Sequence, residues 1–353
     1  MEANPRRIAG LDSIRFLCAA IVMLGHIGLL NSRMLGSSHT GIATIVVGVF
    51  NCLFNGPAAV IVFFVISGFC IHFPFRGQRV LSVPLFFARR FIRILPPAII
   101  VVLILKMGLK AQLNPEDSVL WSVICEGIYY LIYPVLLHLR RKSSWPLLIG
   151  ISFSCAFALL ATHVRALNLA NHEYIALGSA TWVIGLPCWL LGCWLAEEYR
   201  SFRLLSHLEM WFVRIAIYGT SVLLRICMFH ISSPLASNCV MLDLFAIAVY
   251  FWIGVEIVYA ANYGSVRVLE WSGGWSYSLY LVHPSMGIVL SAIGLSFIET
   301  GATTHFLANI ISLFASYGFY LLVERPARLL AVAVGRALSP EVPYLAKASL
   351  ELG

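Results

Sequence analysis

Long apolar runs recur along almost the whole chain, and they constrain its fold more than any other feature. A run of about 20 residues is long enough to cross the ~30 Å hydrocarbon core of a bilayer as an α-helix. Of the 353 residues, 60% are hydrophobic and only 11% are charged, whereas a typical soluble domain has about 25% charged residues. A soluble fold of this length would lack polar surface. The sequence therefore predicts an all-α integral membrane protein.

The chain has room for about ten transmembrane helices joined by short loops. The first apolar run contains Arg15 and His26 and has no small-residue cleavage site, so we interpret it as a span and not as a signal peptide. The apolar segment 42–55 is expected to be a re-entrant or interfacial piece, or an extension of the second span. We predict one domain over 1–339 and a short cytoplasmic tail over 340–353. The predicted spans are 11–30, 57–75, 94–110, 119–138, 146–163, 179–196, 209–230, 239–261, 275–297 and 305–323.

The distribution of Lys and Arg predicts the orientation. Ten spans put both termini on one side, and the termini and loops of that side contain seventeen of the 24 Lys and Arg residues, against five on the opposite face. Basic loops remain in the cytoplasm, so both termini are expected there. The formal net charge of +8 therefore reflects topology, and no soluble basic face for nucleic acid is expected. None of the nine cysteines forms a CxxC pair, so no metal site is expected.

Ionisable residues inside a span are costly and usually face the bundle interior, so each is a candidate functional residue. Arg15 and His26 are eleven residues apart, which puts them on one helix face about 16 Å apart along the axis. Asp12 can pair with Arg15 three residues later. The alternative is that Asp12 and Arg15 anchor the helix end and His26 lies at the outer interface.

A carboxylate in the predicted fourth span is the second candidate. Glu126, Tyr130 and Tyr133 share one face at i, i+4, i+7 spacing, and a lone carboxylate in an apolar span needs a partner or a proton. Helix geometry places Glu126 and His26 at similar depth in the outer half of the membrane, which predicts a site reached from the outer face. The alternative is a hydrogen-bonded structural contact between helices.

The last two spans add further polar residues. Ser276, Tyr280 and His283 fall on one face, and Pro284 frees a backbone carbonyl that can line a polar cavity. His283 has the alternative of being a packed polar residue. Glu324, at the end of the last span, is expected in interfacial structure, where a cytoplasmic arginine can pair with it.

Three arginines, Arg89, Arg90 and Arg93, are predicted to form a cytoplasmic loop directly before a helix that starts at Pro96. Guanidinium groups bind phosphates through two parallel hydrogen bonds, and a helix N-terminus also favours anions. The alternative is an ordinary positive-inside anchor.

Taken together, these motifs resemble the membrane acyltransferase-3 family, bacterial enzymes that O-acylate sugars and related hydroxyl compounds. The resemblance implies ten spans with cytoplasmic termini, a multi-pass location in the bacterial inner membrane, and acyl-CoA, usually acetyl-CoA, as the cytoplasmic donor. The motifs cover residues 10–326 and are Gly10-Leu11-Asp12-Ser13-Ile14-Arg15 with His26, Phe63-Phe64-Val65-Ile66-Ser67-Gly68-Phe69, Arg89-Arg90-x-x-Arg93-x-x-Pro96, Trp121-Ser122 with Glu126 and Tyr130, Ser276-Tyr277-Ser278-Leu279-Tyr280-Leu281-Val282-His283, and Glu324-Arg325-Pro326.

The resemblance also implies that Arg15 and His26 are essential and that Arg89, Arg90 and Arg93 contact CoA. Acyl transfer from a thioester to a hydroxyl needs a base for the hydroxyl proton, so we expect His26 to be the general base or, as a second route, a transient acyl-imidazole. Glu126 would orient His26 or the acceptor. The expected CoA contacts are Arg15, Arg89, Arg90 and Arg93, and the expected contacts to a carbohydrate or other hydroxyl acceptor are Tyr130, Ser276, Tyr280 and His283.

Two other classes remain as alternatives. A polytopic transporter or exporter of a small or glycan-like solute also places ionisable residues within the membrane. No inverted repeat is visible in the sequence, however, and the arginine loop has no role in transport. A sensor or scaffold would not need the Arg15 and His26 pair.

Overall fold

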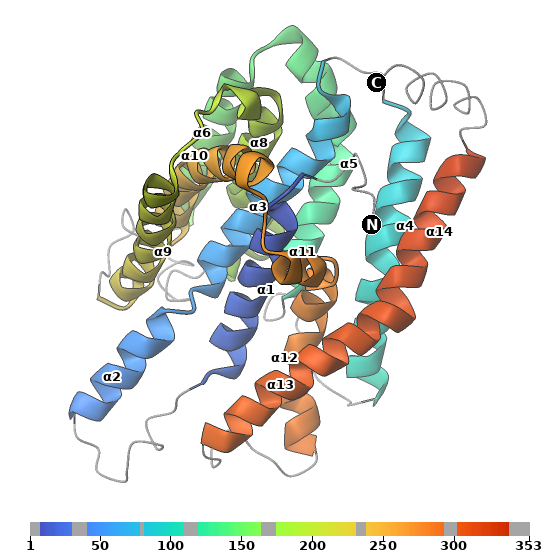
Figure 1. Ribbon diagram of the computed structural model, residues 1–353. Helices are drawn as coiled ribbons and strands as arrows, with labels where there is room; N and C mark the ends of the chain where they lie inside the picture. The colour runs from blue at the N-terminus through green and yellow to red at the C-terminus, as the bar shows by residue number, and fades with distance from the viewer. Residues whose placement is uncertain are drawn as a thin grey trace.

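The computed structural model describes residues 8–29, 41–77, 81–108, 119–163, 174–230, 238–292 and 302–338. Within these ranges the chain is helical and has no strands, which confirms the all-α class. Figure 1 shows the helices, which are α1 (Leu11–Ile27), α2 (Gly41–Cys52), α3 (Gly56–His72), α4 (Val83–Leu103), α5 (Leu120–Lys142), α6 (Trp145–Thr162), α8 (Thr181–Glu198), α9 (His207–His230), α10 (Asn238–Tyr263), α11 (Arg267–Gly273), α12 (Ser276–Ala292), α13 (Ala302–Phe319) and α14 (Arg325–Ala337). Short 3-10 helices cover Phe73–Phe75, Tyr174–Ala180 and Tyr199–Ser201, and π-helical turns (called π-turns below) cover Ile104–Gly108 and Tyr320–Glu324.

In the part of the chain that the structure describes, seven helical stretches are long and apolar enough to cross a membrane. This is the pattern of a multi-pass membrane protein. Every predicted span overlaps one of the helices above, but α1 and α12 have only 17 residues each, and α4 carries three arginines. The number of ten spans and the side on which the termini lie therefore stay predictions. The predicted tail over 340–353 lies outside the described residues.

The apolar segment 42–55 forms α2 and the junction to α3. The composition is apolar without a gap over Ile45–Phe75, but the helix is interrupted at Leu53–Asn55. At this break the Asn55 side chain caps α3 by accepting a hydrogen bond from the Ala58 amide at 3.2 Å. The segment is therefore helical and adjoins the second predicted span, and its placement relative to a membrane stays a prediction. Figure 1 shows α2 projecting beyond the bundle.

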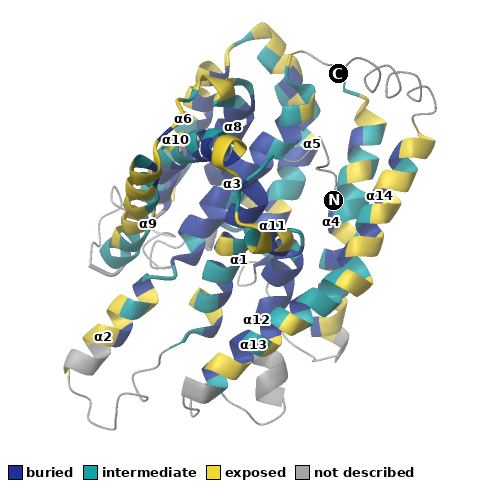
Figure 2. Cartoon of the chain, viewed as in Figure 1, coloured by how far each residue is buried: buried dark blue, intermediate teal, exposed yellow. Residues whose placement is uncertain are grey.

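Helices α3 and α8 form the centre of the bundle, and Figure 2 shows α3 as largely buried. Two glycines allow their backbones to touch. A Cβ atom on Gly68 would lie 1.9 Å from the Trp189 carbonyl oxygen, and one on Gly192 would lie 1.9 Å from the Val65 carbonyl oxygen. Small residues permit such close helix contacts in membranes. This contact fixes the position of Ser67, which lies next to Gly68.

Helices α3, α5 and α8 all end at the same end of the bundle, where Arg76, Arg140, Arg141 and Arg200 line one pocket. We call this the basic end. Helix α1 starts near it, because the Arg15 side chain reaches Cys70 close to the end of α3.

The predicted arginine loop is wrong. Helix α4 begins at Val83 and continues through all three arginines and past Pro96 and Pro97. Pro84 occupies the first turn, where a missing amide proton costs nothing, and the helix starts eleven residues before the predicted span at 94. The two inner prolines remove backbone donors but do not end the helix. The arginines therefore lie along a helix side and not at a helix N-terminus.

The helix does not end with the last predicted span. The chain continues from α13 through the π-turn at Tyr320–Glu324 directly into α14. Glu324 is 0% exposed, and its position relative to the membrane interface stays a prediction. Helix α14 then packs along α4, and a Cβ atom on Gly335 would lie 2.0 Å from Nε of Arg89.

Candidate active site

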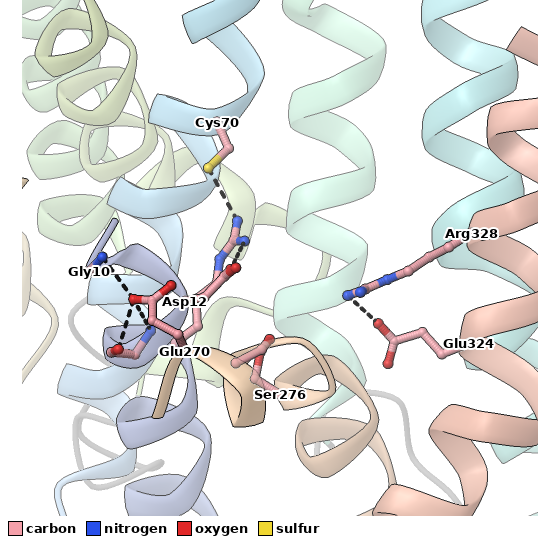
Figure 3. Close-up of polar contacts among 10 residues, drawn as sticks. Gly10, Asp12, Cys70, Glu270, Ser276, Glu324 and Arg328 are labelled. Atoms are coloured by element: carbon pink, nitrogen blue, oxygen red, sulfur yellow. Dashed lines mark hydrogen bonds and ion pairs between the residues drawn. The ribbon is translucent and has the colours of Figure 1, made fainter. Parts of the chain in front are cut away.

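Helix α1 carries Arg15 and His26, and neighbouring helices hold both of its ends. At the start, where Gly10 has a φ of 90°, the Glu270 carboxylate of α11 accepts hydrogen bonds from the Gly10 amide and the Ser13 hydroxyl, each at 2.8 Å (Figure 3). An acceptor at this position satisfies free donors of the first turn. At the other end, Nδ1 of His305 donates to the Ile27 carbonyl oxygen at 2.9 Å.

Arg15 lies between α1 and α3. Its Nη1 atom donates to Oδ1 of Asp12 at 3.3 Å, and its Nη2 atom donates to the Cys70 sulfur at 3.3 Å (Figure 3). The predicted pairing of Asp12 with Arg15 is therefore confirmed. The guanidinium also lies within electrostatic range of Glu126 and Tyr130 on α5. Arg15 thus faces the bundle interior near the basic end.

His26 pairs with His283 across the interface of α1 and α12. Nδ1 of His26 lies 3.1 Å from Nε2 of His283, and the ring centroids are 5.1 Å apart. His283 is fully buried. The sequence places these residues 257 positions apart, and no local pattern links them.

The carbonyl contacts of the two rings fix their tautomers. Nδ1 of His283 lies 2.9 Å from the Leu279 carbonyl oxygen, and Nδ1 of His26 lies 2.9 Å from the Val22 carbonyl oxygen. A carbonyl oxygen only accepts, so both Nδ1 atoms carry the proton. Nε2 of His283 then accepts from His26, and the lone pair of a neutral His26 ring is on its Nε2 atom. This is the tautomer that a general base at Nε2 requires.

Glu126 forms a separate cluster between α3 and α5. Its Oε1 atom accepts hydrogen bonds from Ser67 Oγ at 2.5 Å and from the Tyr130 hydroxyl, and Trp189 Nε1 donates to Ser67 Oγ at 3.3 Å. The structure therefore gives His26 a histidine partner where the sequence analysis expects Glu126. Glu126 lies within electrostatic range of Arg15, and the similar depth of Glu126 and His26 in a membrane stays a prediction.

Tyr280 links the two groups. Its hydroxyl lies 2.7 Å from Ser122 Oγ, one turn of α5 away from Glu126, and its ring lies 6.1 Å from that of His283. Ser276, by contrast, donates to the Gly273 carbonyl oxygen at 2.9 Å. The shared face of α12 thus brings Tyr280 and His283 towards α1 and α5, while Ser276 is engaged with its own backbone.

The three arginines of α4 point to two sides. Arg90 lies within electrostatic range of Tyr130, Glu126 and Arg93, so it faces the Glu126 cluster. Arg89 contacts α14 at Gly335, and Arg93 lies within electrostatic range of Arg328 on α14.

Glu324 has one expected partner, an arginine, and one that the sequence does not predict, Ser278. Glu324 accepts hydrogen bonds from Oγ of Ser278 at 2.5 Å and from its amide at 3.1 Å, and it pairs with Arg328 at 2.6 Å (Figure 3). The i, i+4 spacing of Glu324 and Arg328 is a local signal that predicts the ion pair. The contribution of Ser278 depends on how α12 packs on the π-turn, which the sequence does not reveal.

These residues define a class of protein: a helical membrane bundle with ionisable and polar side chains between its helices, among them Arg15, Glu126 and the pair of His26 and His283. A family model described as an acyltransferase domain, that of the acyltransferase-3 family, matches residues 8–324. The chain belongs to this family, so the resemblance seen in the motifs is confirmed and the protein is a membrane acyltransferase. No curated protein and no solved structure matches the chain.

Proposed function

We propose that this membrane acyltransferase moves an acyl group, most simply acetyl, from cytoplasmic acyl-CoA to a hydroxyl of a sugar or glycan-type acceptor. The observation that carries the proposal is the pair formed by His26 and His283. His283 holds the His26 ring in place, and the Val22 carbonyl contact gives that ring the tautomer with a basic Nε2 atom, in a chain whose family transfers acyl groups.

The reaction is an acyl exchange between two nucleophiles. Nε2 of His26 takes the proton of the acceptor hydroxyl while the hydroxyl oxygen attacks the thioester carbonyl. The tetrahedral intermediate then collapses, the carbon–sulfur bond breaks, and the CoA thiolate takes the proton from His26. The same lone pair also suits the second route, through an acyl-imidazole, in which His26 attacks the thioester first.

The donor is proposed to enter at the basic end, which the positive-inside rule assigns to the cytoplasm. Arg90 faces the Glu126 cluster, which lies within electrostatic range of Arg15, and Arg93 lies within electrostatic range of Arg328 on α14. Both would bind the phosphates of CoA through charge-assisted hydrogen bonds. Arg89, which contacts α14, would bind the CoA phosphates from the side of α4 that faces α14. The long arm of CoA would carry the thioester towards His26. The location would be the bacterial inner membrane.

The acceptor is proposed to bind between α5 and α12. Glu126, Tyr130 and Tyr280 lie on both sides of this interface and bond to hydroxyl groups of the protein, and sugar hydroxyls would exchange with these partners. Ser276 would then shape the start of α12 through its bond to Gly273. His283 would position His26 and would not bind the acceptor.

The test is radiolabelled acetyl-CoA added to the purified protein with a panel of sugars and glycans. We expect label to appear in one acceptor, together with stoichiometric free CoA. Movement of a panel glycan across a proteoliposome membrane, without acetyl-CoA consumption, would favour the transporter alternative and contradict the proposal.

A further inference from the structure

A second polar feature lies at the basic end, and none of the residues of the candidate active site, Arg15, Glu126, His26 and His283, lines it. A pocket of about 480 Å³ opens between the ends of α3, α5 and α8. Its lining is rich in arginine and consists of His72, Phe75, Arg76, Gly77, Leu137, Arg140, Arg141, Glu197, Tyr199 and Arg200.

The positive charge of this pocket is only partly compensated. Glu197 accepts from Nη2 of Arg140 at 2.7 Å and from Nε2 of His72 at 2.9 Å, so the one lining carboxylate is already engaged. Among the described residues, the ion pairs involve none of Arg76, Arg141 and Arg200. Three guanidinium groups therefore face one cavity without a carboxylate of their own.

Two of these cations are held close together. Nη1 of Arg76 and Nε of Arg200 donate to the same Tyr199 hydroxyl, at 3.0 and 3.1 Å. The Arg76 guanidinium also stacks on the Phe73 ring, 3.9 Å from its centroid. Like charges repel at this separation, and an anion between them would remove the repulsion. The guanidinium groups of Arg76 and Arg200 are thus already held side by side, as an anionic ligand requires.

The pocket is separate from the proposed donor site. None of the arginines of α4 lines the pocket. The ring of Phe75, which does line it, contacts the rings of Phe86 and Tyr133, with centroids 5.9–6.1 Å apart. Positive-inside anchoring requires only that basic residues lie on one side of the membrane. It does not explain why four arginines from three helix ends converge on one cavity.

We infer that this pocket binds a phosphate-bearing anion through Arg76, Arg141 and Arg200, at a site distinct from the one proposed for the acyl donor. Guanidinium forks match phosphate oxygens in geometry and charge. The same chemistry is present in a phospholipid headgroup at the membrane surface and in a soluble phosphate compound. The inference does not rest on the proposed function, because it concerns neither His26 nor the arginines of α4.

The test measures how fast phenylglyoxal modifies each arginine of the full chain, mapped by peptide mass spectrometry. The protein is held in phosphatidylcholine nanodiscs alone, in the same nanodiscs with inorganic pyrophosphate, and in phosphatidylglycerol nanodiscs. We expect Arg141 and Arg200 to react several-fold more slowly in at least one of the two phosphate-bearing conditions. Exposed Arg267, which does not line the pocket, should react equally fast in all three.

The condition that slows the modification of Arg141 and Arg200 identifies where the phosphate group comes from. Protection by pyrophosphate indicates a soluble phosphate compound, and protection by phosphatidylglycerol alone indicates a lipid headgroup. The Arg76→Gln variant, with unchanged reactivity at Arg267 as its folding control, should lose the protection of Arg200. Equal rates at Arg141 and Arg200 in all three conditions, or protection of Arg267 to the same extent, would overturn the inference.

Discussion

At the scale of single residues, His283 has a defined task in the account. It accepts the Nδ1 proton of His26 at 3.1 Å while its own Nδ1 atom is bonded to the Leu279 carbonyl oxygen. An aromatic replacement keeps the volume but removes this acceptor, so the His26 ring loses its contact with α12 and can turn away.

We therefore predict that His283→Phe lowers kcat by about 10- to 100-fold, a typical part of a general-base contribution, with little change in the KM for acetyl-CoA. His283→Gln should retain more activity, because its side-chain oxygen can accept the same proton. Steady-state kinetics of both variants measures this. If the two variants lost kcat equally, hydrogen bonding by His283 would not be the cause.

Arg90 is the arginine of α4 that faces the Glu126 cluster. Lysine would keep the charge but lose the planar fork. We expect Arg90→Lys to raise the KM for acetyl-CoA by roughly 10- to 100-fold, since a lost charge-assisted contact costs about 1.5–3 kcal/mol. Arg267→Lys is the matched control. Calorimetric binding of acetyl-CoA by Arg90→Lys with wild-type affinity would remove Arg90 from the donor site.

Residue patterns predict local contacts and miss distant ones. Asp12 and Arg15 pair as their i, i+3 spacing predicts. The partner of His26 is not predictable in this way, because His283 reaches it only through the packing of α1 on α12. Glu126 shows both cases: its bond to Tyr130 follows from their i, i+4 spacing, whereas its bond to Ser67 depends on how α3 packs on α5.

At the scale of helices, the contact of α3 with α8 supports the site. Gly192→Ala places a methyl group 1.9 Å from the Val65 carbonyl oxygen, so the two helices must separate. Overpacking of this kind costs about 1–3 kcal/mol. We predict a lower apparent Tm, measured by fluorescence-detected size-exclusion after heating in detergent.

The control for this change is Gly150→Ala on α6, where an added Cβ meets no atom within 4 Å. It should leave the apparent Tm unchanged or raise it slightly, since alanine favours the helix. An equal Tm for the Gly192→Ala and Gly150→Ala variants would show that α3 and α8 are not packed as closely as described.

Helix boundaries were predictable where composition changes sharply and not where the chain uses unusual turns. Helix α5 is anticipated closely at its start. Helix α4 differs because prolines within a helix resemble a helix start, and α13 differs because a π-turn carries the chain on through Glu324. Both departures place an arginine in a helix, next to buried groups, where the sequence predicts a loop. These arginines are Arg90 on α4 and Arg328 on α14.

At the scale of the whole molecule, the account depends on orientation, because the donor must reach the basic end from the cytoplasm. Single cysteines replacing Lys142, at the end of α5, and His163, after α6, lie at the two ends of α6. In a cysteine-free background they should react with an impermeant thiol reagent from opposite sides of the membrane. The Ser37 position, which the orientation argument also places on the outer face, lies outside the described residues. Labelling of both cysteines from one side would contradict the map of spans.

The central claim is that His26 performs the chemistry of acyl transfer, and the most direct measurement is acetyl transfer by His26→Ala. The matched control is His138→Ala, which removes an exposed histidine of α5. Both variants should be expressed and elute as folded protein. We predict that His26→Ala loses at least about 10²-fold in kcat, the lower bound for a general base, while His138→Ala keeps wild-type activity. Acetyl transfer by His26→Ala within about threefold of wild type, a change of only ~0.7 kcal/mol in the barrier, would contradict the account.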